Sequence, residues 1–99
     1  MASYLIGHIT IKNEKLWQEY LAGVQESLIP YKSKIIFRGK LVSVLAGKHE
    51  HNLVVVIKFH DQATLDNWYS SEKYQLLIPI RDKAANVVIT TYNDTEPKN

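Results

Sequence analysis

The sequence predicts a single α+β domain over residues 1–99, with an ordered core over 3–92 and a flexible tail over 93–99. Its length of 99 residues is that of one domain, because only longer chains divide their core. Hydrophobic residues make up 45% of the chain and charged residues 22%, an ordinary composition for a globular protein. The spacing of the apolar residues switches between the two-residue period of strands and the 3.6-residue period of helices. The resulting order of elements is βαββαβ.

The first half of the chain predicts a strand, a helix and a long second strand. Residues 3–11 are rich in β-branched and aromatic side chains, which are typical of strands. Asn13 can cap a helix, and the spacing that follows is helical until Pro30, which cannot continue a helix. Residues 34–46 are predicted to form the second strand, and Gly39 inside it is expected to mark a bulge or a bend.

The next segment predicts a hairpin and a second helix. Residues 47–52 are polar and have the composition of a turn. Residues 53–59 are predicted to form the third strand. Asp61 follows and is placed to cap a helix over 62–69 through its side chain.

The last part of the chain predicts a broken helix and a final strand. Residues 72–85 have helical spacing, but Pro79 lies among them. A proline in a helix interior removes a hydrogen bond and clashes with the preceding turn, so a kink or a break is expected near residue 78. Residues 86–92 are predicted to form the last strand.

The order βαββαβ is that of the ferredoxin-like sandwich, here with a four-stranded antiparallel sheet whose helices cover one face. The strands 53–59 and 86–92 carry consecutive apolar residues, so both of their faces are apolar. A sheet with one face in water should instead alternate apolar and polar residues. An open apolar face of this size is unusual on a monomer. We therefore expect a second copy of the chain to cover it, in a face-to-face homodimer that encloses a space between the two sheets.

Charge and cysteine content exclude several classes of protein. The formal charge is +2 and the basic residues are scattered, so no nucleic-acid partner is expected. The chain has no cysteine, which excludes disulfides and thiol chemistry and fits a reducing compartment. The N-terminus shows no targeting segment and no apolar run of the ~20 residues that a membrane helix requires. We expect a cytoplasmic protein with no membrane partner.

The segment of residues 68–81 resembles the signature of the domain-of-unknown-function family numbered 1330. The family pattern is an aromatic-tyrosine pair, any residue, a serine, two residues, tyrosine-glutamine, and an arginine six residues on. Its counterparts here are Trp68-Tyr69, Ser71, Tyr74-Gln75 and Arg81. The resemblance extends from about residue 3 to 92. The family is similar to the dimeric α+β barrel superfamily, which includes small monooxygenases, so the resemblance also implies a dimer.

Two positions depart from the family pattern. Lys58 stands where the family usually has an acid before Phe59, so a mechanism that uses a carboxylate there is not expected. Glu72 follows the motif serine where the family tends to have proline, and this affects how the helix restarts.

Two strand residues are candidates for chemistry in the enclosed space. If Gly7 faces the helices, His8 faces that space, where it could act as an acid/base group near neutral pH. The alternative is a hydrogen-bonded histidine packed at the dimer contact. Arg38 precedes Gly39, where a bulge would aim the guanidinium inward to bind a carboxylate or a phosphate. The alternatives are an exposed charge on an edge strand and an ion pair between subunits.

The helical segment contributes four more candidates. Tyr69, Ser71, Tyr74 and Arg81 could together bind an anionic or oxygen-rich ligand at the mouth of the barrel. Tyr74 and Arg81 lie about two turns apart, so they share a helix face unless Pro79 breaks the helix. The alternative, which we favour, is a structural network that fixes the helices to the sheet.

Other motifs carry less chemistry. His49 and His51 flank Glu50 in the polar turn, but no third ligand lies nearby in the sequence, so they indicate a polar loop. Trp68 is expected in the core, because large aromatic residues at helical spacing usually pack there. The chain has no glycine-rich phosphate loop and no serine elbow. No metal and no cofactor are expected.

These expectations combine into a function. The chain should bind a small organic molecule in a largely apolar cavity between sheet and helices, with the arginine, tyrosine and serine candidates orienting the ligand. Cofactor-free catalysis with His8 as the acid/base group is one form of this function. The alternative is a non-catalytic dimer that senses a ligand or binds another protein. The fold alone does not decide whether the protein is an enzyme, because one fold hosts many functions.

Overall fold

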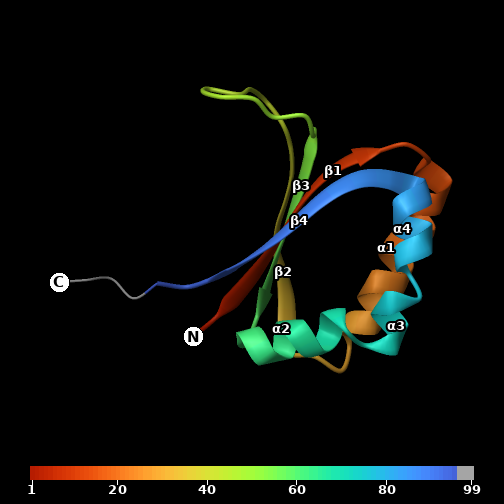
Figure 1. The fold of residues 1–99 in the computed structure, drawn as a ribbon, viewed down its shortest axis with the longest axis vertical. Helices are drawn as coiled ribbons and strands as arrows, with labels where there is room; N and C mark the ends of the chain where they lie inside the picture. Colours follow the sequence, from red (N-terminus) through yellow and green to blue (C-terminus); the bar gives the residue numbers. More distant parts are fainter. Residues whose placement is uncertain (96–99) are drawn as a thin grey trace.

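The computed structural model describes residues 1–95, which form one sheet with all helices packed on the same face (Figure 1). The four strands are antiparallel and pair in the order β2-β3-β1-β4. The elements are β1 (Ser3–Ile11), α1 (Glu14–Leu28), β2 (Ser33–Lys40), β3 (Leu53–Phe59), α2 (Gln62–Tyr69), α3 (Glu72–Gln75), α4 (Ile78–Ala84) and β4 (Ala85–Asn93). This is the predicted ferredoxin-like arrangement.

The two predicted helix caps are confirmed. Oδ1 of Asn13 accepts a hydrogen bond from the backbone N–H of Leu16 at 3.0 Å. Oδ1 of Asp61 accepts one from the backbone N–H of Thr64 at 2.8 Å and another from the Thr64 hydroxyl at 2.6 Å. The first N–H groups of a helix have no partner within it, so these side chains determine where α1 and α2 begin.

The predicted break in the second helical region is also confirmed. Helix α3 ends at Gln75, and α4 begins at Ile78. Pro79 lies in the first turn of α4, where the missing backbone N–H costs no helical hydrogen bond. The break turns the chain between the two short helices and brings Arg81 back towards α1 and α2.

The end of the chain differs slightly from the prediction. Strand β4 runs one residue further than expected, to Asn93, whose side-chain amide donates to Oε1 of Gln62 at 2.8 Å. The backbone N–H of Asp94 donates to the carbonyl of Ala2 at 3.0 Å. The rest of the predicted flexible tail, residues 96–99, lies outside the described residues.

The second strand is shorter than predicted. It ends at Lys40, and residues 41–52 form a long loop that extends past the end of the sheet (Figure 1). A backbone hydrogen bond of 2.7 Å from Leu41 N–H to the carbonyl of Asn52 closes the base of this loop. Val42 and Leu45 are almost fully exposed in it. The apolar residues of this segment therefore have no sheet face to pack on, which is why their pattern does not produce a strand.

The bulge of β2 lies at Ile36 and not at Gly39, which corrects the prediction. The register of β2 against β3 shifts between Ile35 and Phe37, so Ile36 is the inserted residue. Gly39 remains in the regular ladder, opposite Val54. A Cβ atom at Gly39 would lie 2.6 Å from the ring of Phe37. The glycine thus makes room for an aromatic ring on the same strand.

The core lies between the helices and the sheet. Phe59, Trp68 and Tyr74 are its largest fully buried side chains. The indole N–H of Trp68 donates to Oγ of Ser27 at 2.9 Å, and the Ser27 hydroxyl donates to the carbonyl of Val24 at 2.7 Å. The predicted core position of Trp68 is therefore confirmed, and its polar atom is satisfied.

The other face of the sheet carries no helix (Figure 1) and is called the open face below. Its side chains come from alternate residues of each strand. They are Tyr4, Ile6, His8 and Thr10 of β1, Lys34 and Phe37 of β2, Val54, Val56 and Lys58 of β3, and Asn86, Val88, Thr90 and Tyr92 of β4. Phe37 is 55% exposed and Val88 is 48% exposed. The open face therefore presents apolar side chains to its surroundings, interspersed with polar ones.

Candidate functional site

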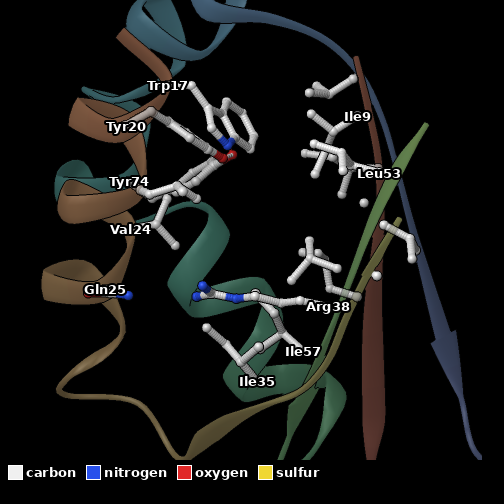
Figure 2. A pocket seen from close by; sticks show the side chains of 18 of the residues that line it. Ile9, Trp17, Tyr20, Val24, Gln25, Ile35, Arg38, Leu53, Ile57 and Tyr74 are labelled. Carbon is white, nitrogen blue, oxygen red and sulfur yellow. Dashed lines mark hydrogen bonds between the residues drawn. The ribbon is translucent and has the colours of Figure 1, made fainter. Parts of the chain in front are cut away.

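A cavity of about 220 Å³ lies between α1 and the helix-covered face of the sheet (Figure 2). Its walls are mostly apolar. They include Leu5, Ile9, Val55 and Ile57 from the sheet and Trp17 and Val24 from α1. Gly7 forms part of the wall at the middle of β1, and a Cβ atom there would lie 3.1 Å from Cγ1 of Val55. The absence of a side chain at this position helps to keep the cavity open.

A network of hydroxyl groups lies at one end of the cavity. The hydroxyl oxygens of Tyr20, on α1, and Tyr74, on α3, are 2.9 Å apart. Nη1 of Arg81 donates to the hydroxyl of Tyr74 at 3.1 Å and to that of Tyr69 at 3.3 Å. Figure 2 shows the Tyr20 and Tyr74 hydroxyls meeting beside the ring of Trp17. The hydroxyls at this end therefore have partners within the protein.

The pKa values of Tyr20 and Arg81 are both raised within this network. Burial, and then the neighbouring Tyr74, raise the pKa of Tyr20, so its hydroxyl remains protonated. Burial by itself lowers the pKa of Arg81, but hydrogen bonds to Tyr69 and Tyr74 outweigh it and raise the pKa above its ordinary value. The network thus holds the positive charge of Arg81 close to the protonated hydroxyl of Tyr20.

Arg38 lies at the other end of the cavity. Its side chain reaches from β2 towards α1, with the guanidinium directed at Gln25 (Figure 2). Arg38 pairs with Val55, which faces the helices, and this places both side chains on the helix side of the sheet. The inserted Ile36 causes this placement, because one extra residue reverses which face the following side chains occupy. The ion pairs of residues 1–95 do not involve Arg38.

His8 lies on the open face, as predicted from Gly7 facing the helices. The loop of residues 41–52 brings His49 next to it, with 4.8 Å between the ring centroids. His51 follows at 6.0 Å from His49, and its Nδ1 lies 3.0 Å from the hydroxyl of Thr10. Nδ1 of His8 is buried without a hydrogen-bond partner among the described residues. Burial, then His49 and His51, lower the pKa of His8 below its ordinary value.

The structure divides the candidates that the sequence grouped together. His8 and Arg38 lie on opposite faces of the sheet, so the expectation that both face one enclosed space is wrong. The physical reason is the bulge at Ile36, which turns Arg38 to the helix side. A proton-transfer role for His8 would therefore belong to the open face and not to the cavity.

The helical candidates are brought together, but for different purposes. Oγ of Ser71 donates to the carbonyl of Trp68 at 2.6 Å and accepts from the N–H of Tyr74 at 3.3 Å, so it caps α3. The ring of Tyr69 lies 4.9 Å from that of Tyr74 and does not line the cavity. Of the four helical candidates, Tyr74 is the one that lines the cavity. This arrangement is close to the structural network that the sequence analysis favoured.

Three residues of the site were missed as functional candidates. Tyr20 carries a hydroxyl on the apolar stripe of α1, which is a visible anomaly in the sequence. Gln25 and Gly7 offer no such indication, since a polar residue on a helix and a glycine in a strand are common. Their role appears only when α1 is placed across from β1 and β2.

Two properties of the described part of the chain limit other kinds of site. No group of three His, Cys, Asp or Glu side chains among residues 1–95 could hold a metal ion, the histidines of the open face included. Within the same residues, no helix combines the length and the apolar character needed to span a membrane.

Residues 2–93 match the family described as "Domain of unknown function (DUF1330)", and the chain belongs to this family. The resemblance in the helical segment is thereby confirmed. No curated protein matches the sequence.

Solved structures share the fold at low identity. A protein of unknown function from Rhodopseudomonas palustris, RPA0582, is 10% identical with a TM-score of 0.81, covering 97% of this chain and 84% of that one. SnoaB, a cofactor-independent oxygenase from Streptomyces nogalater, is 7% identical with a TM-score of 0.66, covering 97% and 95%. A dimeric ferredoxin-like protein of unknown function from Jannaschia sp. CCS1 is 10% identical with a TM-score of 0.66, covering 95% and 100%. These similarities show a common fold.

Proposed function

We propose that the chain is a cytoplasmic homodimer that binds a small organic molecule in the cavity between α1 and the sheet. The observation that carries the proposal is the cavity, which combines apolar walls with a few polar groups at its two ends. An apolar cavity of about 150 Å³ suffices for a benzene molecule. The volume of about 220 Å³ found here therefore suits a ligand of one ring with a short substituent.

The homodimer is supported by the open face. Phe37, Val88 and Tyr92 are each about half exposed on a surface without helices. A second copy packed face to face would cover them on both chains at once, since a two-fold contact uses the same surface twice. The protein from Jannaschia sp. CCS1 that shares this fold is described as dimeric. The proposed cytoplasmic location rests on the sequence, whose lack of cysteine fits a reducing compartment.

Ligand binding is favoured over catalysis by the chemistry of the cavity lining. SnoaB, which shares the fold, is described as a cofactor-independent oxygenase, so a catalytic form of the function deserves a test. However, the described residues that line the cavity include no histidine and no carboxylate. Tyr20 and Tyr74 are the titratable hydroxyls there, and burial raises the pKa of Tyr20. We therefore propose a binding function first, with ligand sensing as its non-catalytic form.

The test uses a neutral probe and a variant that fills the cavity. Indole and toluene should shift backbone amide signals of α1 and β1 in NMR spectra of the wild-type protein. Gly7→Leu places a side chain in the cavity, so these shifts should disappear. Thr91→Leu, on an exposed part of β4 outside the cavity, should leave them unchanged. Circular dichroism checks that both variants fold. If Gly7→Leu does not fold, Gly7→Val replaces it as a smaller substitution.

Two results would contradict the proposal. One is a wild-type spectrum that does not change at saturating probe. The other is equal binding to folded Gly7→Leu and to the wild-type protein. Recovery of the bound probe after incubation in air addresses catalysis, because an unaltered probe supports the non-catalytic form and an oxidised one the enzymatic form.

A further inference from the structure

We propose that the ligand of this cavity is a carboxylate attached to a single aromatic or alicyclic ring, with the carboxylate bound by Arg38 at the cavity mouth. The inference rests on the proposed function and specifies its ligand class. Three observations carry it: the position of Arg38, the charge of the cavity lining and the size of the apolar space.

The position of Arg38 is set by the backbone and not by side-chain flexibility alone. The bulge at Ile36 turns Arg38 to the helix side, opposite Val55 in the ladder. From there the guanidinium crosses towards Gln25 on α1 (Figure 2). A side chain that extends across the gap between sheet and helix lies where a ligand would enter. The guanidinium is planar and offers two parallel N–H groups, which match the two oxygens of a carboxylate.

The charge of the lining favours an anion with one negative charge. Arg38 is the only Lys or Arg among the described lining residues, and no Asp or Glu accompanies it. The other arginine of the chain, Arg81, is held by Tyr69, Tyr74 and Asp82. Arg38 has no such partner within residues 1–95, so its N–H groups remain available. One guanidinium balances one carboxylate, whereas a phosphate monoester carries up to two charges and would lack a second cation.

The size of the apolar space limits the rest of the ligand. Beyond Arg38 the walls are aliphatic, with Trp17 and Tyr20 at the far end. A volume of about 220 Å³ accommodates a ring and a short linker but not a long acyl chain. The Tyr20 and Tyr74 hydroxyls at the far end bond each other at 2.9 Å, so these two groups do not require a polar group on the ligand. The class that fits is therefore amphipathic, with its charge at one end only.

The experiment compares phenylacetate with phenylacetamide, which has nearly the same shape but no charge. Their dissociation constants are measured by NMR titration at low ionic strength, with phenethylamine as the cationic counterpart. We expect phenylacetate to bind most tightly and phenethylamine most weakly. Arg38→Gln should weaken the binding of phenylacetate about tenfold and that of phenylacetamide less than twofold. Arg38→Lys should lose part of the affinity, because a lysine keeps the charge but not the paired N–H groups.

Lys40→Gln is the matched control. Lys40 lies two residues further along β2 and is exposed, and its loss changes the net charge of the protein by the same amount. It does not line the cavity, so it should change the dissociation constant of phenylacetate less than twofold. If Lys40→Gln weakens binding as much as Arg38→Gln, general electrostatic attraction explains the effect and the inference is overturned.

The remaining outcomes separate this inference from the proposed function. The carboxylate assignment is overturned if phenylacetate and phenylacetamide bind equally, or if Arg38→Gln does not weaken the binding of phenylacetate. If Gly7→Leu still abolishes the binding of the probes in that case, the cavity proposal stands. Failure of every probe, the neutral ones included, counts against the proposed function itself and the carboxylate assignment with it.

Discussion

The two faces of the sheet differ in how their polar groups are satisfied. On the helix side, the buried indole of Trp68 and the hydroxyls of Tyr20 and Tyr74 each have a partner within the protein. On the open face, Nδ1 of His8 is buried without a partner among the described residues, and apolar side chains such as Phe37 are half exposed. These buried polar groups of the helix side are thus satisfied within one chain, whereas the open face combines an unpaired buried nitrogen with exposed apolar side chains, which is typical of a surface that binds another molecule.

The comparison also shows how one residue separates two sites. Alternate side chains of a strand face opposite ways, so a single inserted residue exchanges the two faces from that point on. Ile36 is that residue, and it assigns Arg38 to the cavity and Phe37 to the open face. One strand therefore carries, on neighbouring residues, the arginine of the proposed ligand site and a phenylalanine of the proposed dimer contact. The following predictions test this division, beginning with the largest effect.

The first prediction compares one phenylalanine from each face. Phe59 is 0% exposed on the helix side, and Phe59→Ala should lower the free energy of unfolding by about 3–5 kcal/mol, because a large cavity remains in a packed core. Phe37→Ala should lower it by less than about 1 kcal/mol at concentrations where the protein is monomeric. Urea denaturation followed by tryptophan fluorescence measures both values. Similar losses for the two variants would show that the faces do not differ as described.

The second prediction concerns assembly. Phe37→Glu places a charge on the proposed dimer contact, and burying an unpaired charge costs about 3 kcal/mol or more, which is roughly a hundredfold in the dissociation constant of the dimer. Light scattering coupled to size exclusion should show a dimer for the wild-type protein and a monomer for the variant. Leu76→Glu is the control, since Leu76 is 67% exposed between the short helices and away from the open face. A wild-type protein that is monomeric at all concentrations would contradict the proposed dimer.

The third prediction concerns the hydroxyl network on the helix side. Tyr74→Phe removes the hydrogen bonds to Tyr20 and Arg81 and should lower the free energy of unfolding by about 1–3 kcal/mol. Tyr69→Phe removes one longer hydrogen bond to Arg81 and should cost about 1 kcal/mol or less. Thermal unfolding of both variants checks the order. The reverse order would mean that Arg81 relies mainly on Tyr69.

The smallest effect is expected from pH, on the open face. Burial, then His49 and His51, lower the pKa of folded His8 below its ordinary 6.5. Below pH 6.5 the unfolded chain therefore takes up a proton at this position more readily than the folded one, so stability falls as the pH is lowered, down to the folded pKa. Above pH 6.5 the residue is neutral in both states and contributes no dependence.

His8→Gln should make the stability less sensitive to pH in the range just below 6.5, where the lowered pKa of folded His8 produces the dependence. His60→Gln is the control, because His60 is exposed in the turn before α2 and is not among the histidines that lower the pKa of His8. Urea denaturation at several pH values measures the slope. An unchanged slope in His8→Gln would show that the open-face histidines are not coupled as their spacing suggests.

Much of the fold could be predicted because its determinants are local. Asn13 and Asp61 cap helices through side chains that reach only three residues along the chain. Pro79 interrupts a helix by its own covalent structure. The error over residues 41–46 has a physical reason as well. Apolar residues form a strand only where a neighbouring strand offers hydrogen bonds and a packing surface, and β3 begins only at Leu53.

The candidate site was less predictable because its residues meet across the fold. Tyr74 and Arg81 were candidates because they belong to the segment that resembles the family signature. Their spacing alone would not bring them together, because the helix breaks between α3 and α4, yet the turn of the chain leaves them 3.1 Å apart in a structural network. Tyr20 and Gln25 were not predicted as site residues, because the sequence does not indicate which residues of α1 lie opposite Arg38.

By itself the sequence determined the order of the elements, the ends of the helices and the existence of two apolar sheet faces, because these depend on neighbours a few residues apart. Only the tertiary structure decided that the bulge lies at Ile36 and that Arg38 faces the cavity. The position of a bulge depends on the register between two strands, and that register is settled by packing across the whole sheet. The opening at Gly7 likewise becomes a cavity only because α1 crosses above it without filling the space.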